Sequence, residues 1–199
     1  MARAAEDLGT RWSILDAAAR LFRHQGYSGT SLRDIAAAVG MKAGSLYYHF
    51  GSKDEIVVEV LNIGVQRVAD QVRQAVAALP GGAGPDKLIT CAIAAHLRAL
   101  HESGDYTSAN VRIFGQMPER VRAGHAEVRR AYEAYWGELL ERCRRKSRRG
   151  NGWDPHLVRN FVLGAMNASL EWFDPAKGRV EPLAEKMARL VLDGIKGGK

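Results

Sequence analysis

The sequence predicts an all-α protein, and three of its features point to that fold class. Alanine, leucine and arginine, which favour helices, are frequent throughout the 199 residues. Apolar residues recur at helical spacing between short stretches that contain glycine or proline. No run of alternating β-branched residues reaches the length of a strand. We therefore expect helices joined by turns and loops, without a sheet.

The first two helices are predicted from apolar spacing and from their end signals. Apolar residues at helical spacing in the first helix are Ile14, Leu15, Ala18, Leu21 and Phe22. Because Gly26 supplies a stop, this helix is expected over residues 11–25. The segment from Ser31 to Asp34 has the form of a capping box, which predicts a second, short helix over residues 31–39.

A tight turn at residues 40–42, containing a glycine, separates the second helix from a third over residues 45–50. Leu46 and Phe50 are four residues apart, so they share the face that packs on the first two helices. Three short helices with such a turn describe a helix-turn-helix module, whose last helix can enter the major groove of DNA.

The remaining chain is expected to be helical as well. Ser52 to Glu55 forms a second capping box and opens a long helix that ends at Leu79, before the glycine-rich loop at residues 80–85. Five further helices are predicted, over residues 86–102, 106–116, 118–147, 155–173 and 182–196.

The third helix leaves several donors away from the core. With Leu46 and Phe50 packed inward, its other faces carry Ser45, Tyr47, Tyr48 and His49. Hydroxyl and imidazole groups donate to phosphate oxygens, while the small residues Ala43 and Gly44 let the backbone approach DNA closely. Aromatic clusters near helix ends also serve packing, and that interpretation remains the alternative for the rings of residues 47–50.

The segment TSLRDIAAAVGMKAGSLYYHFGSKDEIV, residues 30–57, resembles the DNA-binding signature of the TetR/AcrR family of transcriptional regulators. The similarity covers about residues 13–60. It implies that Arg33, Lys42, Ala43, Gly44 and Ser45 lie toward base edges, and that Tyr47, Tyr48, His49 and Lys53 hold phosphates. One position departs from the family, because Lys42 stands where many members have a serine or threonine N-cap.

The resemblance also implies a division of the chain and a mode of action. Residues 1–53 would form the DNA-binding domain, and residues 54–199 a helical ligand-binding and dimerisation domain. A homodimer would bind double-stranded, palindromic operator DNA and be released by a small hydrophobic or amphipathic effector, which makes the protein a ligand-responsive repressor. The segment at residues 171–195 loosely resembles regulators of fatty-acid or steroid catabolism, several of which respond to acyl-CoA.

The resemblance further implies that the last two long helices pair with those of a second copy in a four-helix bundle, and their residues agree. The first offers small residues, Gly164, Ala165, Ala168 and Ser169, and the second an apolar stripe, Leu183, Met187, Leu190, Val191 and Gly194. The alternative is that both stripes serve only the core of one chain.

Pocket candidates are polar or aromatic residues that interrupt apolar faces. They are His96, Asn110, Arg112, Phe114, Met117, Tyr132, Trp136, Met166, Asn167, Leu170 and Phe173. His96 and His101 are five residues apart, which does not suit two metal ligands on one helix, so no metal site is expected.

Charge and composition limit the remaining possibilities. The formal net charge of +7 suggests an anionic partner, yet basic and acidic residues nearly balance over residues 1–55. The excess lies in Arg142, Arg144, Arg145, Lys146, Arg148 and Arg149. This cluster is suited to coenzyme phosphates, although a solvated helix C-terminus is the simpler interpretation.

No apolar run approaches the ~20 residues of a membrane span, and the N-terminus has no apolar signal segment. The chain also lacks a GxSxG motif, a P-loop and metal-ligand spacing around Cys91 or Cys143. We therefore expect a cytoplasmic protein that is not an enzyme and needs no cofactor or membrane. A helical DNA-binding architectural protein without an effector remains the alternative to a repressor.

Overall fold

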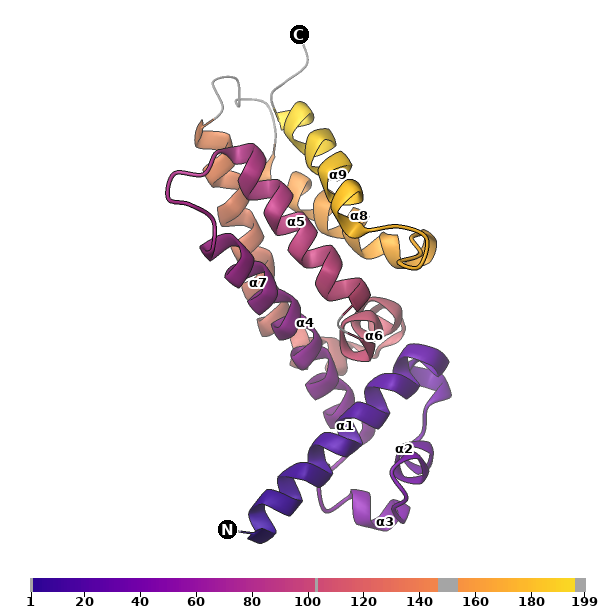
Figure 1. Ribbon diagram of the computed structural model, residues 1–199. Coiled ribbons are helices and arrows are strands. Elements are labelled where there is room, and N and C mark those ends of the chain that lie inside the picture. Colours follow the sequence, from indigo (N-terminus) through magenta and orange to yellow (C-terminus); the bar gives the residue numbers. More distant parts are fainter. Residues whose placement is uncertain (1, 103, 147–153, 196–199) are drawn as a thin grey trace. The chain divides into compact units, whose positions relative to one another are not determined.

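The computed structural model describes residues 2–102, 104–146 and 154–195, and every regular element in these ranges is a helix (Figure 1). This confirms the predicted all-α class. The helices are α1 (Ala2–Gly29), α2 (Leu32–Ala38), α3 (Ala43–Leu46), α4 (Lys53–Ala77), α5 (Pro85–Glu102), α6 (Asp105–Ile113), the 3₁₀ turn η1 (Phe114–Gln116), α7 (Glu119–Lys146), α8 (Pro155–Trp172) and α9 (Val180–Ile195).

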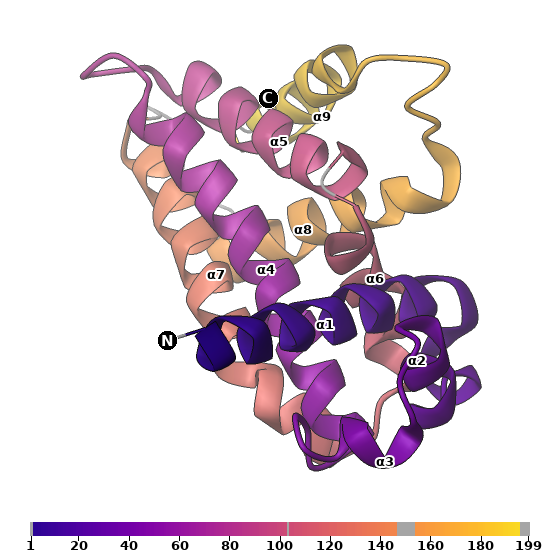
Figure 2. The ribbon, with the colours of Figure 1, turned by 60° about the horizontal axis from the view of Figure 1, so that its bottom comes forward.

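Two compact units divide the chain. The first unit contains Met1–Val65 and Gly104–Arg129, and the second contains Gln66–Ser103 and Arg130–Lys199. Helices α4 and α7 each contribute one end to each unit. In the first unit, α2 and α3 follow α1 and lie beside it in both ribbon views (Figure 2). The predicted division at residue 53 concerns function, and it stays a prediction.

Helix α1 is longer than the sequence indicates, but the break expected at Gly26 is present. Gly26 has φ 75° and ψ 175°, which interrupts the helical backbone inside α1. Positive φ favours glycine at this position because a Cβ would be strained there. Beyond the break, Thr30 Oγ1 donates to the Gly26 carbonyl at 2.8 Å, and the Tyr27 side chain is buried.

The capping box predicted at Ser31 is present in full, and the one predicted at Ser52 is present in part. At α2, Ser31 Oγ accepts from Asp34 N at 3.2 Å while Ser31 N donates to Asp34 Oδ2 at 2.8 Å. Before α4, Ser52 Oγ accepts from Glu55 N at 3.1 Å, and the Glu55 carboxylate accepts from Gly51 N at 2.8 Å. These side chains satisfy backbone N–H groups that have no partner within their helices.

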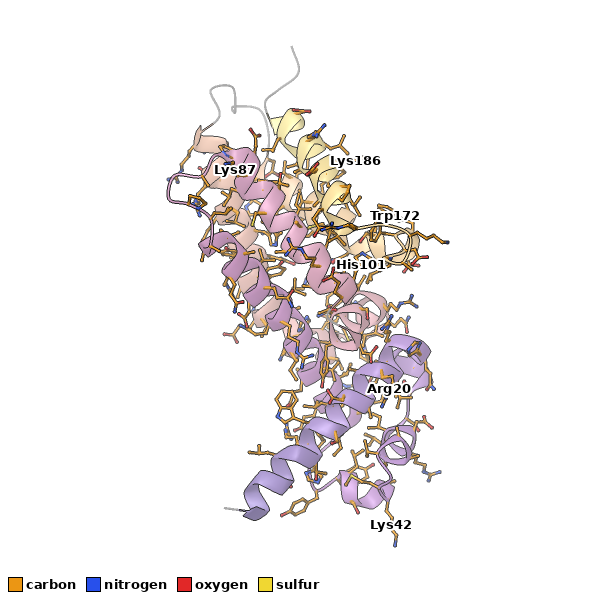
Figure 3. All side chains as sticks on the ribbon, viewed as in Figure 1. Arg20, Lys42, Lys87, His101, Trp172 and Lys186 are labelled. Atoms are coloured by element: carbon orange, nitrogen blue, oxygen red, sulfur yellow. The ribbon has the colours of Figure 1, made fainter. Side chains whose placement is uncertain are left out.

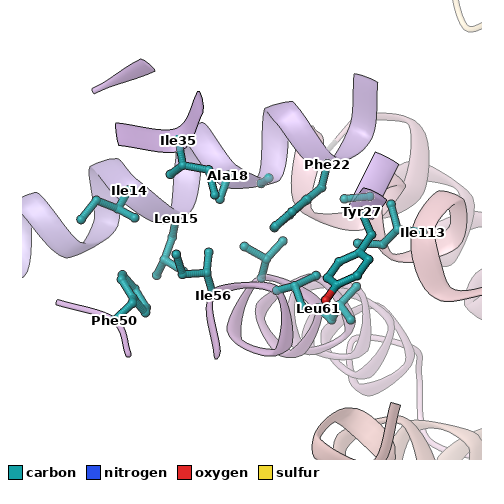
Figure 4. Close-up of a cluster of buried hydrophobic side chains, with 14 of the residues drawn as sticks. Ile14, Leu15, Ala18, Phe22, Tyr27, Ile35, Phe50, Ile56, Leu61 and Ile113 are labelled. Carbon is teal, nitrogen blue, oxygen red and sulfur yellow. The ribbon is translucent and has the colours of Figure 1, made fainter. Parts of the chain in front are cut away.

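The third helix is shorter than predicted, since α3 ends at Leu46 and turns lead on to Phe50. The backbone still makes one helix-like hydrogen bond beyond α3, in which Phe50 N donates to Leu46 O at 3.0 Å. Leu46 and Phe50 are buried, as the i,i+4 spacing predicts, and Phe50 lies in one cluster with Leu15 and Ile56 (Figure 4). Burying each such side chain contributes roughly 1.5–3 kcal/mol, so α3 is held by packing rather than by its own length.

In the second unit, α5 packs against α9 and α8. The α9 face turned inward carries Ala184, Ala188, Val191 and Leu192, all buried. Val191, which was predicted to belong to the dimer stripe, is buried within this unit, and its place in a dimer interface stays a prediction. It lies one helical position beyond Leu190, which rotates it onto the inward face. No described helix has both the length and the apolarity needed to cross a membrane.

Candidate DNA-binding surface and buried polar cluster

The segment around α3 presents most of the predicted DNA-binding residues to solvent. Tyr47 is 59% exposed and Tyr48 is 78% exposed, although Leu46, which directly precedes them, is fully buried. The exposed side chains or backbone positions also include Arg33, Lys42, Gly44 and Ser45, and Ala43 is half-buried. Figure 3 shows Lys42 projecting away from the ribbon. The packing of Leu46 and Phe50 thus fixes which groups face outward.

Lys42 occupies the N-cap position of α3, where the sequence departs from the pattern that it otherwise resembles. Its backbone is extended, with φ −71° and ψ 141°, and its side chain makes no capping hydrogen bond within the described residues. A lysine has no acceptor with which to cap backbone N–H groups. The ammonium group therefore stays on the exposed surface, where base or phosphate contact remains a prediction.

His49 faces the protein, and its predicted contact with a phosphate stays a prediction. Its side chain is only 10% exposed, and Nδ1 lies 3.2 Å from Asp7 Oδ1 on α1. The His49 carbonyl accepts from Arg11 Nη1 at 2.7 Å, and Arg11 also pairs with Glu59 on α4. The turn after α3 directs the His49 ring toward α1. The residues next to His49 in the sequence do not predict this orientation.

Lys53 also has partners inside the protein. Its Nζ donates to the Tyr27 carbonyl at 2.9 Å and to the Thr30 carbonyl at 3.0 Å, and lies 4.0 Å from the centre of the Tyr27 ring. These contacts join the end of α1 to the start of α4. An ammonium has three donors, so a phosphate contact through the third stays a prediction.

The predicted pocket residues do not form one set. Four of them, Asn110, Arg112, Phe114 and Met117, belong to the first unit, and the other seven belong to the second. Met117 is part of the first unit's core, and Asn110 donates to the Leu61 carbonyl at 3.2 Å. Arg112 is exposed. The structure gives Asn110 and Met117 packing roles, because α6 and η1 lie on the helices of the first unit.

In the second unit the structure brings four predicted residues together. His96 Nδ1 lies 2.8 Å from the Tyr132 hydroxyl, and His96 Nε2 lies 3.4 Å from Asn167 Oδ1. The Trp136 ring meets the rings of His96 and Tyr132 edge to face, with centroids 6.1 and 6.5 Å away. We call His96, Tyr132, Trp136 and Asn167 the polar cluster.

The three rings of the polar cluster are buried, Asn167 is half-buried, and the cluster is electrically neutral. Burial lowers the pKa of His96 to about 4 and raises the pKa of Tyr132. Since Asn167 Oδ1 can only accept, His96 Nε2 carries the proton in this arrangement, and Nδ1 accepts from the Tyr132 hydroxyl. The fully buried indole Nε1 of Trp136 acts on the Tyr132 hydroxyl oxygen but has no partner of good hydrogen-bond geometry among the described residues. One donor in the cluster therefore lacks a well-formed hydrogen bond.

The other predicted pocket residues of the second unit lie outside this hydrogen-bonded set. Met166 is buried, while Leu170 and Phe173 are half-buried. Phe173 meets the ring of His101 at 5.0 Å, and His101 Nε2 lies 2.8 Å from Ser169 Oγ. No group of three or more metal-binding side chains occurs in the part of the chain that the structure describes.

Two arginines of the basic cluster are paired on their own helix. Arg144 Nε and Arg145 Nε lie 2.6 and 2.9 Å from the Glu141 carboxylate, whose pKa falls to about 2 because both arginines hydrogen-bond to it. Arg148 and Arg149 lie outside the described residues. These pairs favour the interpretation of a solvated helix end for the described part of the cluster.

Helix α8 exposes an apolar stripe. Leu157, Phe161 and Trp172 are 67%, 63% and 61% exposed, and Trp172 points away from the ribbon in Figure 3. With the exposed Gly164 and Ala168, they recur at steps of three or four residues, so they share one face. The sequence prediction included the two small residues and missed the three large ones, although the same spacing links them.

The remaining dimer candidates divide between exposed and partly covered positions. Leu190 on α9 is exposed, whereas Ala165 on α8 and Leu183 and Met187 on α9 are half-buried. We call the exposed apolar residues of α8, together with Leu190, the apolar stripe: Leu157, Phe161, Gly164, Ala168, Trp172 and Leu190. Large exposed apolar surfaces of this kind mark interaction sites.

Two family models match the chain. Residues 14–60 match the model described as bacterial regulatory proteins, tetR family, and residues 82–195 match the tetracyclin repressor-like C-terminal domain. Together they cover the module with the exposed α3 segment and most of the second unit. The second model alone covers more than half of the sequence.

Individual relatives and solved structures agree with these matches. The chain is 28% identical over 193 residues to the transcriptional repressor KstR2 of Rhodococcus jostii, covering 94% of this chain and 91% of KstR2. Over 72 residues, 36% of this chain and 34% of the relative, it is 39% identical to the regulator AcrR of Shigella flexneri. The crystal structure of PfmR, a TetR-family regulator from Thermus thermophilus, superposes with a TM-score of 0.75 at 28% identity, covering 93% and 96% of the chains.

A further solved structure, AibR in complex with isovaleryl coenzyme A and operator DNA, has the same fold. It superposes with a TM-score of 0.77 at 23% identity and covers 90% of this chain and 96% of AibR.

Proposed function

Because the chain belongs to the TetR family of bacterial regulatory proteins, we propose that it is a homodimeric repressor released from a palindromic operator by a small organic effector. The observation that carries this proposal is the exposed segment from Lys42 to Tyr48, held outward by the buried Leu46 and Phe50. The protein acts in the cytoplasm, where bacterial DNA lies, as a binding protein rather than an enzyme.

The exposed residues have two roles in DNA binding. Lys42 and Arg33 carry charged donors that suit guanine edges, and the small positions Ala43, Gly44 and Ser45 allow close approach to the groove. Tyr47 and Tyr48 present hydroxyl groups to phosphates, which position the protein without reading sequence. His49 and Lys53 support this surface from within, through their contacts to α1.

The dimer forms through the apolar stripe of α8 and α9. Two copies of Phe161 and Trp172 across a two-fold axis would remove the largest exposed apolar side chains of the second unit from water. Gly164 and Ala168, at the centre of the stripe, would let the helices approach closely, since nothing lies within 4 Å of a Cβ placed at Gly164. In this proposal residues 1–53 bind DNA, and residues 54–199 bind the effector and form the dimer.

The effector binds at the polar cluster and presents a hydrogen-bond acceptor to it. A buried donor without a partner costs roughly 1–3 kcal/mol, which an acceptor from a ligand would recover. Because His96 and Tyr132 are neutral at pH 7, the cluster suits a carbonyl oxygen in an apolar surround better than a charged group. An acyl thioester supplies such a carbonyl, and acyl-CoA compounds are the class we propose.

A release assay tests this proposal. An operator duplex would first be selected with the protein from a random library, and its release would then be titrated with isovaleryl-CoA, longer acyl-CoAs, the matching free acids and coenzyme A. A 100-fold release requires about 2.7 kcal/mol of coupling, and the operator must weaken effector binding by the same factor. Release by no acyl-CoA would refute the effector class, and equal affinity for a scrambled duplex would indicate an architectural protein instead.

Trp136→Phe provides the variant, because it keeps an aromatic ring and removes the indole N–H together with the five-membered part of the fully buried indole. We expect it to weaken acyl-CoA binding about tenfold, the value of one hydrogen bond, while operator affinity without effector stays unchanged. Unchanged acyl-CoA affinity would show that the indole is not the donor.

A further inference from the structure

Asp54, in the first turn of α4, receives hydrogen bonds from two other helices of the first unit. The Tyr27 hydroxyl, beyond the break in α1, donates to Asp54 Oδ1. Arg120, in the first turn of α7, donates from Nε to Asp54 Oδ2 at 2.6 Å. Each carboxylate oxygen thus has its own partner, and three chain segments meet at one side chain.

These groups keep fixed protonation states at physiological pH. Burial, together with the neighbouring Asp54 carboxylate, raises the pKa of Tyr27 to about 12, so its hydroxyl remains a donor. The hydrogen bond from Tyr27, helped by Arg120, lowers the pKa of Asp54, so its carboxylate remains an acceptor. The arrangement is therefore permanent at neutral pH and does not switch by protonation.

We call the contacts among Tyr27, Asp54 and Arg120 the junction. It lies where the DNA-binding segment begins and where it ends. Residues 31–52 leave α1 after Thr30 and return to α4 at Lys53. Lys53 holds the carbonyls of Tyr27 and Thr30, and Asp54 holds the Tyr27 hydroxyl. The two ends of the segment that carries α2 and α3 are therefore tied to each other at this point.

Arg120 adds the start of α7 to this junction. Farther along the same helix pair, a Cβ at Gly124 would lie 3.2 Å from Val58 Cγ2, and His125 Nδ1 lies 2.7 Å from Asn62 Oδ1. The first turns of α7 therefore pack closely on α4. Arg120 is itself exposed, and exposed ion pairs contribute little to stability, so fold stability alone does not account for it.

We propose that Asp54 and Arg120 are positioning residues for operator binding, fixing the ends of the α2–α3 segment to the first turn of α7. The proposal rests on the operator binding proposed above. Neither side chain needs to touch DNA, since each acts by holding the junction. Movement of the α7 start would then change the geometry of the DNA-binding surface through a single carboxylate.

The sign of three substitutions separates positioning from simple electrostatics. Asp54→Asn removes a negative charge from a DNA-binding unit, Arg120→Gln removes a positive charge, and Tyr27→Phe changes no charge. If long-range electrostatics alone mattered, Asp54→Asn would tighten DNA binding, Arg120→Gln would weaken it and Tyr27→Phe would leave it unchanged. Positioning predicts that all three weaken binding to the selected operator duplex, each about tenfold.

Fluorescence anisotropy with that duplex provides the measurement, at a temperature where thermal unfolding shows every variant to be folded. Arg122→Gln is the control, because it removes one positive charge from α7, as Arg120→Gln does. The partner of Arg122 is Glu119, 2.5 Å away on α7 itself, so this pair does not connect α7 to another helix. We expect this control to bind like the parent within a factor of about two, and the double variant Asp54→Asn/Arg120→Gln to be no weaker than either single variant.

Tighter binding by Asp54→Asn, or strictly additive effects in the double variant, would overturn the proposal. If Asp54→Asn fails to fold, Tyr27→Phe against Arg120→Gln completes the same cycle. If the parent protein enriches no duplex, both the operator function and this inference are refuted. If the parent binds operator but the substitutions show no energetic coupling, only this inference is refuted.

Discussion

Acidification from pH 7 to pH 5 should destabilise this protein through His96. The ring is buried, and burial lowers its pKa from 6.5 to about 4 in the folded state. Between these two values the unfolded chain binds the proton and the folded chain does not. Stability conferred by the neutral ring is therefore complete above pH 6.5, decreases as the pH falls through that value, and levels off near pH 4.

The size of the effect follows from the two pKa values. Each pKa unit corresponds to about 1.36 kcal/mol. Because the pKa of His96 falls from 6.5 to about 4 on folding, the protein loses about 2 kcal/mol of folding stability between pH 7 and pH 5. Asp54, Asp34 and Glu141 do not contribute in this window, because their pKa values are lowered and their stabilisation is lost only at more acidic pH.

Urea denaturation at pH 7 and pH 5 measures the loss, with His96→Gln as the comparison at equal protein concentration. Glutamine keeps a hydrogen-bonding amide but does not titrate. His125, whose pKa burial also lowers to about 4, is present in both proteins and cancels in the difference. The parent should lose about 2 kcal/mol more than the variant. Equal losses would refute the placement of a neutral, buried His96 in the cluster.

Three further predictions concern the surfaces. Tyr47→Ala should weaken binding to operator and random duplexes alike in anisotropy titrations, whereas Lys42→Ala should cost about 1–3 kcal/mol of discrimination between them; the opposite pattern would exchange their roles. Phe161→Glu should convert the dimer to a monomer in sedimentation at micromolar concentration, because a charge would be buried within the apolar stripe. A dimer that persists would place the interface elsewhere. The double variant Arg144→Ala/Arg145→Ala should leave acyl-CoA affinity unchanged in calorimetry, since both arginines pair with Glu141; a loss confined to acyl-CoA over free acid would give them the coenzyme phosphates.

Local signals in the sequence predicted the architecture of the DNA-binding module well. The capping boxes at Ser31 and Ser52, the break at Gly26 and the buried pair Leu46 and Phe50 each depend on residues within a few positions of one another. Such features are set by backbone hydrogen bonding and helical spacing, which a single sequence displays.

Contacts between distant segments were not predictable in this way. His49 turns to Asp7, Lys53 to Tyr27, and Asp54 to Arg120, across separations that no periodic pattern encodes. The pocket prediction mixed residues of two compact units for the same reason, because helical spacing does not show which unit a helix belongs to.

The most direct test of a sequence-specific, DNA-binding regulator is the ratio of affinities for the selected palindromic duplex and for a scrambled duplex of equal length and composition. Anisotropy titration at physiological salt should give a ratio of at least about 10³, with two protomers bound per palindrome. A ratio near one would contradict the assignment of the Lys42–Tyr48 surface to operator recognition.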